Sequence, residues 1–238
     1  MEATPAYSVI IPAYNEQAWL AKSIPAAQQA MASVAVPGEL IVVDNNSTDA
    51  TGEMARGLGA QVVFESINQI SRARNAGVKA ASGDYYVFLD ADTLLTPELL
   101  GQTLEALSSG RCCGGGALVS MEASDSKIAS GLFMLVVKLV QLQKIATGCF
   151  VFCRADAFND IGGFSEKVFA TEEYWFSLRL KRWGRQHAMP FELFNNQRII
   201  TSSRKFEHSG NLWAMLLTAC VPFSIFFRWS CGFWYKRP

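Results

Sequence analysis

The sequence has no net charge of either sign. Its 238 residues include 21 Lys and Arg and 21 Asp and Glu, so the formal charge is zero at pH 7. Proteins that bind nucleic acids usually carry a surplus of basic residues, because these neutralise the phosphate backbone. The balance therefore argues against a nucleic acid as the main partner of this protein.

Cysteine spacings typical of zinc sites or disulfide-stapled domains are also absent. The cysteines form no Cys-x-x-Cys pair, and residues 1–7 show no signal-peptide pattern. Half of the residues are hydrophobic, so a chain of this length can bury a core without covalent staples. We therefore expect reduced, mostly buried cysteines and a cytoplasmic location. The six are Cys112, Cys113, Cys149, Cys153, Cys220 and Cys231.

Internal repeats and low-complexity linkers are missing as well, and the length fits one large domain or two small ones. The sequence does contain a regular alternation of short apolar runs and helical segments over its first 92 residues. Helices between short buried strands predict parallel strands joined by right-handed crossovers. The expected strands are 7–11, 39–43, 60–64 and 85–89, and the expected helices are 17–33, 49–59 and 72–81.

Several residues predict helix boundaries and interruptions. Pro25 is expected to kink or split the first helix, because proline lacks the N–H that a helix interior needs. Ser47 or Thr48 can cap the second helix, and Ser71 can cap the third. Beyond residue 92 we expect helices at 97–109, 128–144 and 171–184, and strands at 114–121, 149–153 and 198–202. The apolar segment 128–144 is too short to span a membrane comfortably.

Polar residues follow three of the four predicted strands. They are Asn15 and Glu16 after the first strand, Asp44–Asp49 after the second and Asp90–Asp92 after the fourth. The carboxyl ends of parallel strands meet at one edge of a sheet, where α/β proteins bind their ligands. The three clusters therefore predict a binding site at this edge.

The third cluster consists of two carboxylates separated by one small residue, Asp90-Ala91-Asp92. Residues i and i+2 share a face of an extended chain, so both carboxylates can point to one spot. Two anionic oxygens there can hold a hard divalent cation that also binds the phosphates of a substrate. A solvated turn after a core strand would have the same pattern, and so short a motif does not decide between the two.

The last part of the chain, residues 211–238, differs in composition. Residues 212–227 are almost wholly apolar, no acidic residue follows Glu207, and basic and aromatic residues alternate near the end. This run falls short of the roughly 20 residues that span a bilayer. Aromatic residues mixed with cations are typical of a membrane interface. We expect this tail to lie on a membrane surface, with packing against the domain or a dimer partner as the alternative.

A set of short motifs occurs in the order found in one protein family. The ordered set resembles the family 2 glycosyltransferases, which have the A-type nucleotide-sugar transferase fold. The matching segments cover about residues 7–184. They are Val9–Glu16, Val42–Thr51, Ala73–Gly77 with Ala81–Tyr85, Phe88–Asp92, Gly162–Phe164, and Glu172-Glu173 ahead of Leu178–Leu180.

The resemblance implies an α/β fold with a mostly parallel central sheet flanked by helices. It divides a catalytic domain, residues 1–210, into a nucleotide-sugar half at 7–110 and an acceptor half at 111–210. The apolar tail would follow at 211–238. The cysteines and the composition of this tail, taken together, predict a protein that is peripheral on the cytoplasmic face of a membrane.

The implied activity is transfer of a sugar from a nucleoside-diphosphate sugar to an acceptor hydroxyl with inversion at the anomeric carbon. The implied donor is a UDP-sugar, with GDP as the other candidate, and the implied cofactor is Mn²⁺ or Mg²⁺. The Gln-x-x-Arg-Trp motif of processive members is absent, which indicates transfer of single sugars. The acceptor stays open, and lipid-linked and small-molecule glycans are both plausible.

The resemblance also assigns roles to individual residues. Asp90 and Asp92 would hold the metal ion on the donor diphosphate, and Asp90 would reach the ribose. Asp44 would contact the base of the nucleotide. Ser203–Lys205 and His208 are further candidates for holding the diphosphate, although the sequence does not place them. The full set expected to bind the nucleotide sugar is Pro12, Ala13, Tyr14, Glu16, Asp44, Asn46, Arg72, Arg74, Asn75, Asp90, Ala91 and Asp92.

Glu173 falls where the family has its catalytic base, which is usually an aspartate after an acidic residue. The glutamate is one methylene longer, and Glu172 is the alternative base. The first turn of a helix stabilises an anion, which would weaken a base there. Burial beside Trp175 and the substrate could raise the pKa again. Without the resemblance, both glutamates would be ordinary acids at a helix N-terminus.

Two other classes of protein remain as alternatives. A phosphatase of the haloacid dehalogenase type would use Asp90 as nucleophile and Asp92 as acid or base, but its motif normally follows the first strand of the domain. A non-catalytic scaffold that binds sugar nucleotides would keep the pocket and lack an effective base. The glutamate at position 173 leaves this second alternative open.

Overall fold

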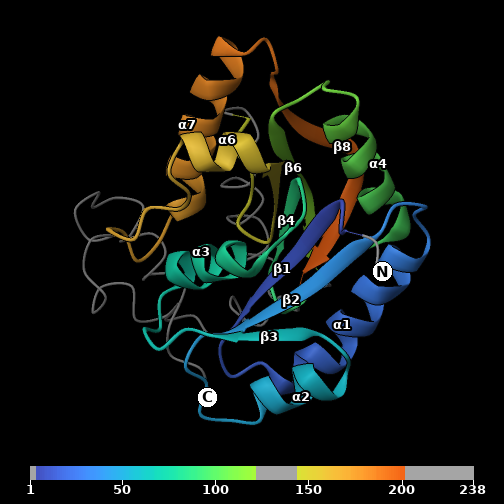
Figure 1. Cartoon of the computed structure of the whole chain (residues 1–238), viewed down its shortest axis with the longest axis vertical. Helices are drawn as coiled ribbons and strands as arrows, with labels where there is room; N and C mark the ends of the chain where they lie inside the picture. Colours follow the sequence, from blue (N-terminus) through green and yellow to red (C-terminus); the bar gives the residue numbers. More distant parts are fainter. Residues whose placement is uncertain (1–3, 122–143, 202–238) are drawn as a thin grey trace.

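The computed structural model describes residues 4–121 and 144–201 of the chain (Figure 1). Several predicted features lie outside the described residues. They are nearly all of the helix at 128–144, the residues Ser203, Arg204, Lys205 and His208, and the tail at 211–238.

One mixed sheet of eight strands forms the centre of the described structure, in the order β3-β2-β1-β4-β7-β6-β8-β5. The first four strands in the chain are parallel to one another, as predicted. The strand β7 then pairs antiparallel with both β4 and β6, whereas β6 and β8 are parallel and β5 and β8 antiparallel. The strands are β1 Tyr7–Ala13, β2 Gly38–Asp44, β3 Gln61–Phe64, β4 Tyr85–Leu89, β5 Thr93–Leu94, β6 Gly114–Met121, β7 Phe150–Arg154 and β8 Phe191–Thr201.

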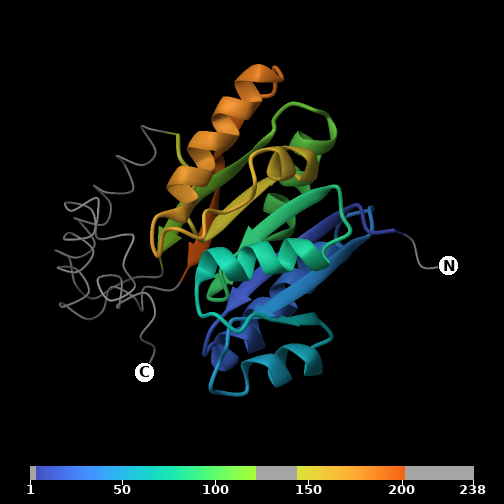
Figure 2. The ribbon, with the colours of Figure 1, turned by 60° about the vertical axis from the view of Figure 1, so that its left-hand side comes forward.

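Helices cover both faces of this sheet (Figure 2). Successive residues of a strand point to opposite faces, and the buried residues of β1 follow this rule. Val9 and Ile11 pack in a core with α1, α2 and α4, whereas Ile10 packs in a second core with α3, α6 and α7. The helices are α1 Gln17–Ala32, α2 Thr51–Gly57, α3 Ile70–Ala80, α4 Pro97–Ser108, α6 Ala155–Asp160 and α7 Glu172–Gln186.

The second core contains a cluster of phenylalanine rings. The rings of Phe164 and Phe176 stack with their centroids 4.2 Å apart, and the edge-on contact of Phe88 with Phe164 measures 5.0 Å. Phe88 belongs to β4 and Phe176 to α7, so the cluster fixes the start of α7 against the central strand. Aromatic pairs of this geometry stabilise beyond the area that they bury.

Pro25 does not split the first helix. The helix α1 runs without a break from Gln17 to Ala32 with Pro25 inside it. Both Pro25 and Ala21, whose carbonyl loses its intrahelical partner, are exposed, so water can satisfy that carbonyl. Burial of Leu20 and Ile24 holds the helix on the sheet across the gap.

The predicted caps of α2 and α3 are wrong. The helix α3 begins at Ile70, which places Ser71 inside it, and α2 begins at Thr51 with Ala50 as its cap. The loop before α2 is longer than predicted because its hydroxyl groups bond to the loop after β1. The cap of α4 is confirmed, since Thr96 accepts a hydrogen bond from the Leu99 N–H at 3.3 Å.

Two short elements, β5 and α6, were not predicted, and β8 begins seven residues earlier than expected. Polar residues in the first part of β8 conceal its strand character, although Phe194 is buried. The cysteines of the described ranges, Cys112, Cys113, Cys149 and Cys153, are buried and free, as predicted. No helix within residues 4–121 and 144–201 is long and apolar enough to cross a membrane.

Candidate active site

The predicted gathering of polar residues at one sheet edge is confirmed. The strands β2, β1 and β4 are neighbours and run in the same direction, so their carboxyl ends lie side by side. Ala13 at the end of β1 pairs in register with Asp44 at the end of β2. The loops that follow these strands therefore form one edge of the molecule.

The loops after β1 and β2 are bonded to each other. The Asn15 N–H donates to Ser47 Oγ at 3.1 Å, and the Thr48 N–H donates to Asn15 Oδ1 at 2.8 Å. The Glu16 N–H donates to Thr51 Oγ1 at 2.8 Å. Asn15 has a φ of 51°, a left-handed conformation that asparagine tolerates better than most residues. Of the predicted pocket residues, Pro12, Ala13 and Glu16 are buried and Tyr14 is partly buried.

Asp44, the last residue of β2, lies beside these two loops. Its Oδ1 accepts the Ser47 N–H at 2.9 Å, and the side chain is only partly buried. A Cβ at Gly52 would lie 2.8 Å from Asp44 Oδ2, so a glycine at that position makes room for the carboxylate. Asn46 has a φ of 64° and turns the chain directly after the strand. The structure thus places Asp44 and Asn46 at the predicted edge.

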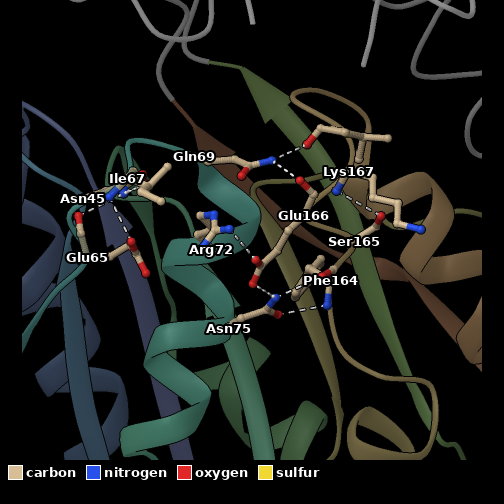
Figure 3. A network of polar contacts seen from close by, with 11 residues as sticks. Asn45, Glu65, Ile67, Gln69, Arg72, Asn75, Phe164, Ser165, Glu166 and Lys167 are labelled. Atoms are coloured by element: carbon tan, nitrogen blue, oxygen red, sulfur yellow. Dashed lines mark hydrogen bonds and ion pairs between the residues drawn. The ribbon is translucent and has the colours of Figure 1, made fainter. Parts of the chain in front are cut away.

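Asn45, between these two residues, was not predicted to matter. Its side chain is buried and donates to the Ile67 carbonyl at 2.7 Å, which ties the end of β2 to the loop after β3 (Figure 3). Nothing in the local pattern Asp-Asn-Asn indicates that Asn45 is buried and that Asn46 is an exposed turn residue.

Asp90 and Asp92 lie in a turn, not on an extended strand. The strand β4 ends at Leu89, and the Thr93 N–H donates to the Asp90 carbonyl at 3.1 Å. The argument from alternation along an extended strand is therefore wrong for this pair. Both aspartates nevertheless lie within one turn at the carboxyl end of the central strand. The side chain of Asp90 is 15% exposed, and Asp92 as a whole residue is 2% exposed.

A buried arginine connects this turn to the start of α7. Arg74 Nη1 donates to Glu172 Oε1 at 2.6 Å, and Nη2 donates to Asp90 Oδ1 at 3.2 Å and to the Gly148 carbonyl at 2.8 Å. Burial lowers the pKa of Arg74, but Glu172 and Asp90 outweigh that effect and raise it above its ordinary value. The guanidinium is therefore a permanent cation between two carboxylates that are 82 positions apart in sequence.

Glu173 lies next to this ion pair and is partly buried. A Cβ at Gly148 would lie 3.4 Å from Glu173 Oε1, so the carboxylate faces the segment that precedes β7. Burial, followed by the charge of Glu172, raises the pKa of Glu173 from 4.5 to about 8, although Arg74 opposes the shift. Trp175, which was expected to help bury this carboxylate, is itself 43% exposed.

The other predicted residues of α3 contact the loop before α7, as Figure 3 shows. Arg72 forms an ion pair with Glu166 at 3.1 Å. Asn75 accepts the Phe164 N–H at 2.9 Å and donates to the Phe164 carbonyl at 3.0 Å. Gln69 donates to the carbonyls of Glu166 and Val168, both at 2.8 Å.

Gln69, Gly148 and Glu166 are therefore residues of the site that were not predicted. Gly162 and Gly163 mark a turn in the sequence, and their φ values of 74° and 64° agree with one. No local pattern indicates that this turn packs on a helix some 90 residues earlier in the chain.

The donor atoms at the end of β4 suit a hard divalent cation. Carboxylate oxygens are the ligands that Mg²⁺ and Mn²⁺ prefer, and Asp90 and Asp92 supply them. The described residues contain no group of three or more His, Cys, Asp or Glu arranged to hold a metal ion. A cation on this pair would need ligands from a substrate or water, as Mg²⁺ sites that bind phosphates commonly do.

Comparison with known proteins shows the family to which the chain belongs. The model of the family "Glycosyl transferase family 2" matches residues 8–162, which includes β1, β2, β4 and both aspartates. The chain belongs to glycosyl transferase family 2. This assignment confirms the resemblance inferred from the motifs. It argues against the phosphatase alternative, as does the position of Asp90 after the fourth strand and not the first.

Relatives in the family cover the chain only in part. The dolichol-phosphate mannosyltransferase of Pyrococcus furiosus is 35% identical over 108 residues, which are 43% of this chain and 30% of the relative. Glycosyltransferase AglE of Haloferax volcanii is 29% identical over 174 residues, which are 67% of this chain and 56% of the relative. The chain therefore spans between about a third and about half of the length of these curated relatives.

Solved structures confirm the predicted A-type fold. The mannosyltransferase PcManGT of Pyrobaculum calidifontis, in complex with GDP-Man and Mn²⁺, superposes with a TM-score of 0.62 over 84% of this chain and 57% of that one, at 18% identity. Residues 1–349 of S. aureus TarS with UDP-GlcNAc give a TM-score of 0.60 over 82% of this chain and 58% of that one, also at 18% identity. At such identities the likeness shows the fold alone.

Proposed function

We propose that this family 2 protein transfers a single sugar from a nucleoside-diphosphate sugar to an acceptor hydroxyl, with inversion at the anomeric carbon. The observation that carries the proposal is the cluster around Arg74, which joins the Asp90 turn to Glu172 and lies beside Glu173. A site for a charged leaving group and a candidate base are thus held together by one buried side chain.

Glu173 is the proposed general base. An acceptor hydroxyl must lose its proton as it attacks, and a positioned base contributes about 10²–10⁴-fold to the rate. A carboxylate is most effective when its pKa lies near the working pH, and the pKa of Glu173 is about 8. Glu172 is the weaker candidate, because it is buried and its Oε1 is 2.6 Å from Arg74 Nη1.

Asp90 and Asp92 would hold Mn²⁺ or Mg²⁺. The bound ion would neutralise the charge that develops on the departing nucleoside diphosphate. The chain itself fixes the position of Asp90 through Arg74 and through its N–H, which donates to the Cys149 carbonyl at 3.1 Å. Mn²⁺ occurs with GDP-Man in the Pyrobaculum enzyme, which supports this choice of ions.

The proposed nucleotide pocket is the rim formed by the loops after β1 and β2. Asp44 and Asn46 would meet the base, and Tyr14 would line the pocket beside them. Structural neighbours contain either GDP-Man or UDP-GlcNAc, so both bases are compatible with the fold. We propose a UDP-sugar as the donor, with a GDP-sugar as the alternative to be tested beside it.

The acceptor and location are also proposals. A lipid-linked or small-molecule glycan on the cytoplasmic face of a membrane fits a tail rich in aromatic and basic residues at 211–238. The name of the Pyrococcus relative gives dolichol phosphate as the partner of that protein, which supports a lipid-linked acceptor here.

Release of nucleoside diphosphate from a panel of UDP-sugars and GDP-sugars tests the proposal. With Mn²⁺ present, one donor should be consumed with acceptor-dependent turnover, and removal of the metal by a chelator should stop the reaction. Asp92→Asn should abolish it, because the variant loses a charged ligand. Full activity of this variant would contradict the metal site, and tight binding of a donor without turnover would favour the scaffold alternative.

A further inference from the structure

Two arginines two residues apart in α3 have opposite environments. The side chain of Arg72 is 35% exposed and pairs with Glu166 at the surface, whereas that of Arg74 is 1% exposed. Residues i and i+2 of a helix project about 200° apart, which explains why the two point in different directions. Of the two, only Arg72 is accessible to a ligand from solvent.

The guanidinium of Arg74 is occupied by the protein itself. Nη1 and Nη2 make three hydrogen bonds, to Glu172, Asp90 and Gly148, while Nε has no hydrogen-bond partner among the described residues. The Arg74 Cζ lies 5.1 Å from the ring centroid of Phe164, so that ring covers the group. A contact between Arg74 and a diphosphate would require it to leave a buried ion pair.

The three partners of Arg74 belong to three separate segments. Asp90 follows β4, Gly148 precedes β7, and Glu172 is the first residue of α7. The first segment carries a proposed metal ligand, the second faces the Glu173 carboxylate, and the third contains Glu173 itself. The planar fork of an arginine suits such a junction, because its donors have fixed directions, whereas a lysine is a flexible point charge.

We propose that Arg74 is a positioning residue that holds the first residues of α7 at a fixed distance from the Asp90 turn, rather than a contact to the donor. This role rests on the proposed function, because it matters for catalysis only if Glu173 and the Asp90 turn act on the same substrate. Misplacement of a catalytic group by about 1 Å can reduce the rate on the order of 10²-fold.

Kinetic analysis of Arg74→Lys, Glu172→Gln and the double variant tests the proposal. Lysine keeps the buried positive charge, and glutamine keeps the shape of Glu172, so these changes disturb folding less than truncation would. We expect Arg74→Lys to lower kcat by roughly 10–100-fold while the donor KM changes less than about threefold. Because Arg74 acts through Glu172, the double variant should lose little more than Arg74→Lys alone.

Arg72→Lys is the matched comparison, two residues away on the same helix. If Arg72 meets the donor, its substitution should raise the donor KM, which is the opposite pattern to that expected for Arg74→Lys. A rise in the donor KM of Arg74→Lys with unchanged kcat would overturn the positioning role in favour of a direct contact. Additive losses in the double variant would overturn it as well.

Hydrogen exchange separates this proposal from the proposed function. Arg74→Lys should speed exchange at the Tyr174 and Thr93 amides, which bond within the α7 start and the Asp90 turn, and leave the amides of β2 unchanged. If the natural protein shows no turnover with any donor, the proposed function fails. The exchange result then still decides on Arg74, since unchanged exchange at both amides would overturn its role.

Discussion

Glu173 combines two opposing influences on one carboxylate. The helix N-terminus and Arg74 favour its charged form, whereas burial and the neighbouring Glu172 disfavour it, and the balance raises its pKa to about 8. The motif before Leu178–Leu180 indicated Glu173 as a candidate base, and this role stays a prediction. The balance of effects on its pKa could not be inferred from the sequence, because it depends on Arg74 and on burial next to Gly148, and both residues are distant from Glu173 in sequence.

The raised pKa predicts a specific dependence of activity on pH. The base must be deprotonated, so kcat/KM should rise about tenfold per pH unit below about pH 8 and level off above it. Initial rates measured from pH 6 to 9.5 with a saturating metal ion would check this. A flat profile between pH 6 and 8 would contradict a base with this pKa.

Glu173→Gln should separate binding, turnover and stability. Folded Glu173 holds its proton up to about pH 8, whereas the unfolded residue releases it near 4.5, so wild-type stability falls as the pH rises between these values. The variant should keep nucleotide binding and lose turnover, because it lacks only the base. Glutamine does not titrate, so the variant should also unfold at a higher urea concentration than wild type at pH 9. At pH 4 the urea midpoints of variant and wild type should be the same, which serves as the control. Equal midpoints at pH 9 as well would contradict a raised pKa of Glu173.

At the scale of single elements, close packing of α3 on the sheet brings Arg72, Arg74 and Asn75 to the site. Gly77 allows this approach, because a Cβ there would lie 2.4 Å from Ile10 Cγ2 and 3.1 Å from Val43 Cγ2. The sequence predicted this helix at 72–81, and the motif Ala73–Gly77 within it contributed to the family resemblance. The motif did not indicate that Gly77 allows close packing on the sheet, or that Asn75 binds the loop at Phe164.

Gly77→Ala should therefore destabilise the protein, by about 1–3 kcal/mol, as overpacking in a core usually does. Gly101→Ala is the matched control, since Gly101 is also inside a helix and a Cβ there would meet nothing within 4 Å. That change should stabilise by about 0.4–1 kcal/mol. Urea unfolding midpoints of the two variants would check the contrast, and equal shifts would contradict the packing account.

Element boundaries were predictable only where local chemistry decides them. Thr96 and Pro97 start α4 as expected, because the cap is satisfied within the same turn. The starts of α2 and α3 were misjudged, since Ser47 bonds to Asn15 and Gln69 bonds to the 164–168 loop. Hydrogen bonds between distant segments override local capping preferences in both cases.

At the scale of the whole molecule, the fold class followed from the alternation of strands and helices. Parallel pairing of β1, β2 and β4 places the loops that follow them at one edge, and this much is a consequence of chain direction. The antiparallel entry of β7 between β4 and β6 was not predictable, because alternation alone does not give strand order.

Truncation after Gly210 tests the proposed role of the tail at 211–238. If the tail binds the protein to a membrane surface, the shortened chain should move from the membrane fraction to the supernatant, because it loses the aromatic and basic residues near its end. Fractionation of cell lysates checks this, with retained nucleotide binding as the control for folding. Unchanged recovery in the membrane fraction would contradict the proposal.

Calorimetric titration of UDP and of GDP, each with and without Mn²⁺, tests the central claim most directly. The proposed site predicts micromolar binding of one of the two nucleotides that requires the metal and is lost in Asp92→Asn. Such a result would establish the metal-dependent pocket and identify the base of the donor. Absence of binding for both nucleotides in the presence of Mn²⁺ would contradict a nucleotide-sugar site at this edge of the sheet.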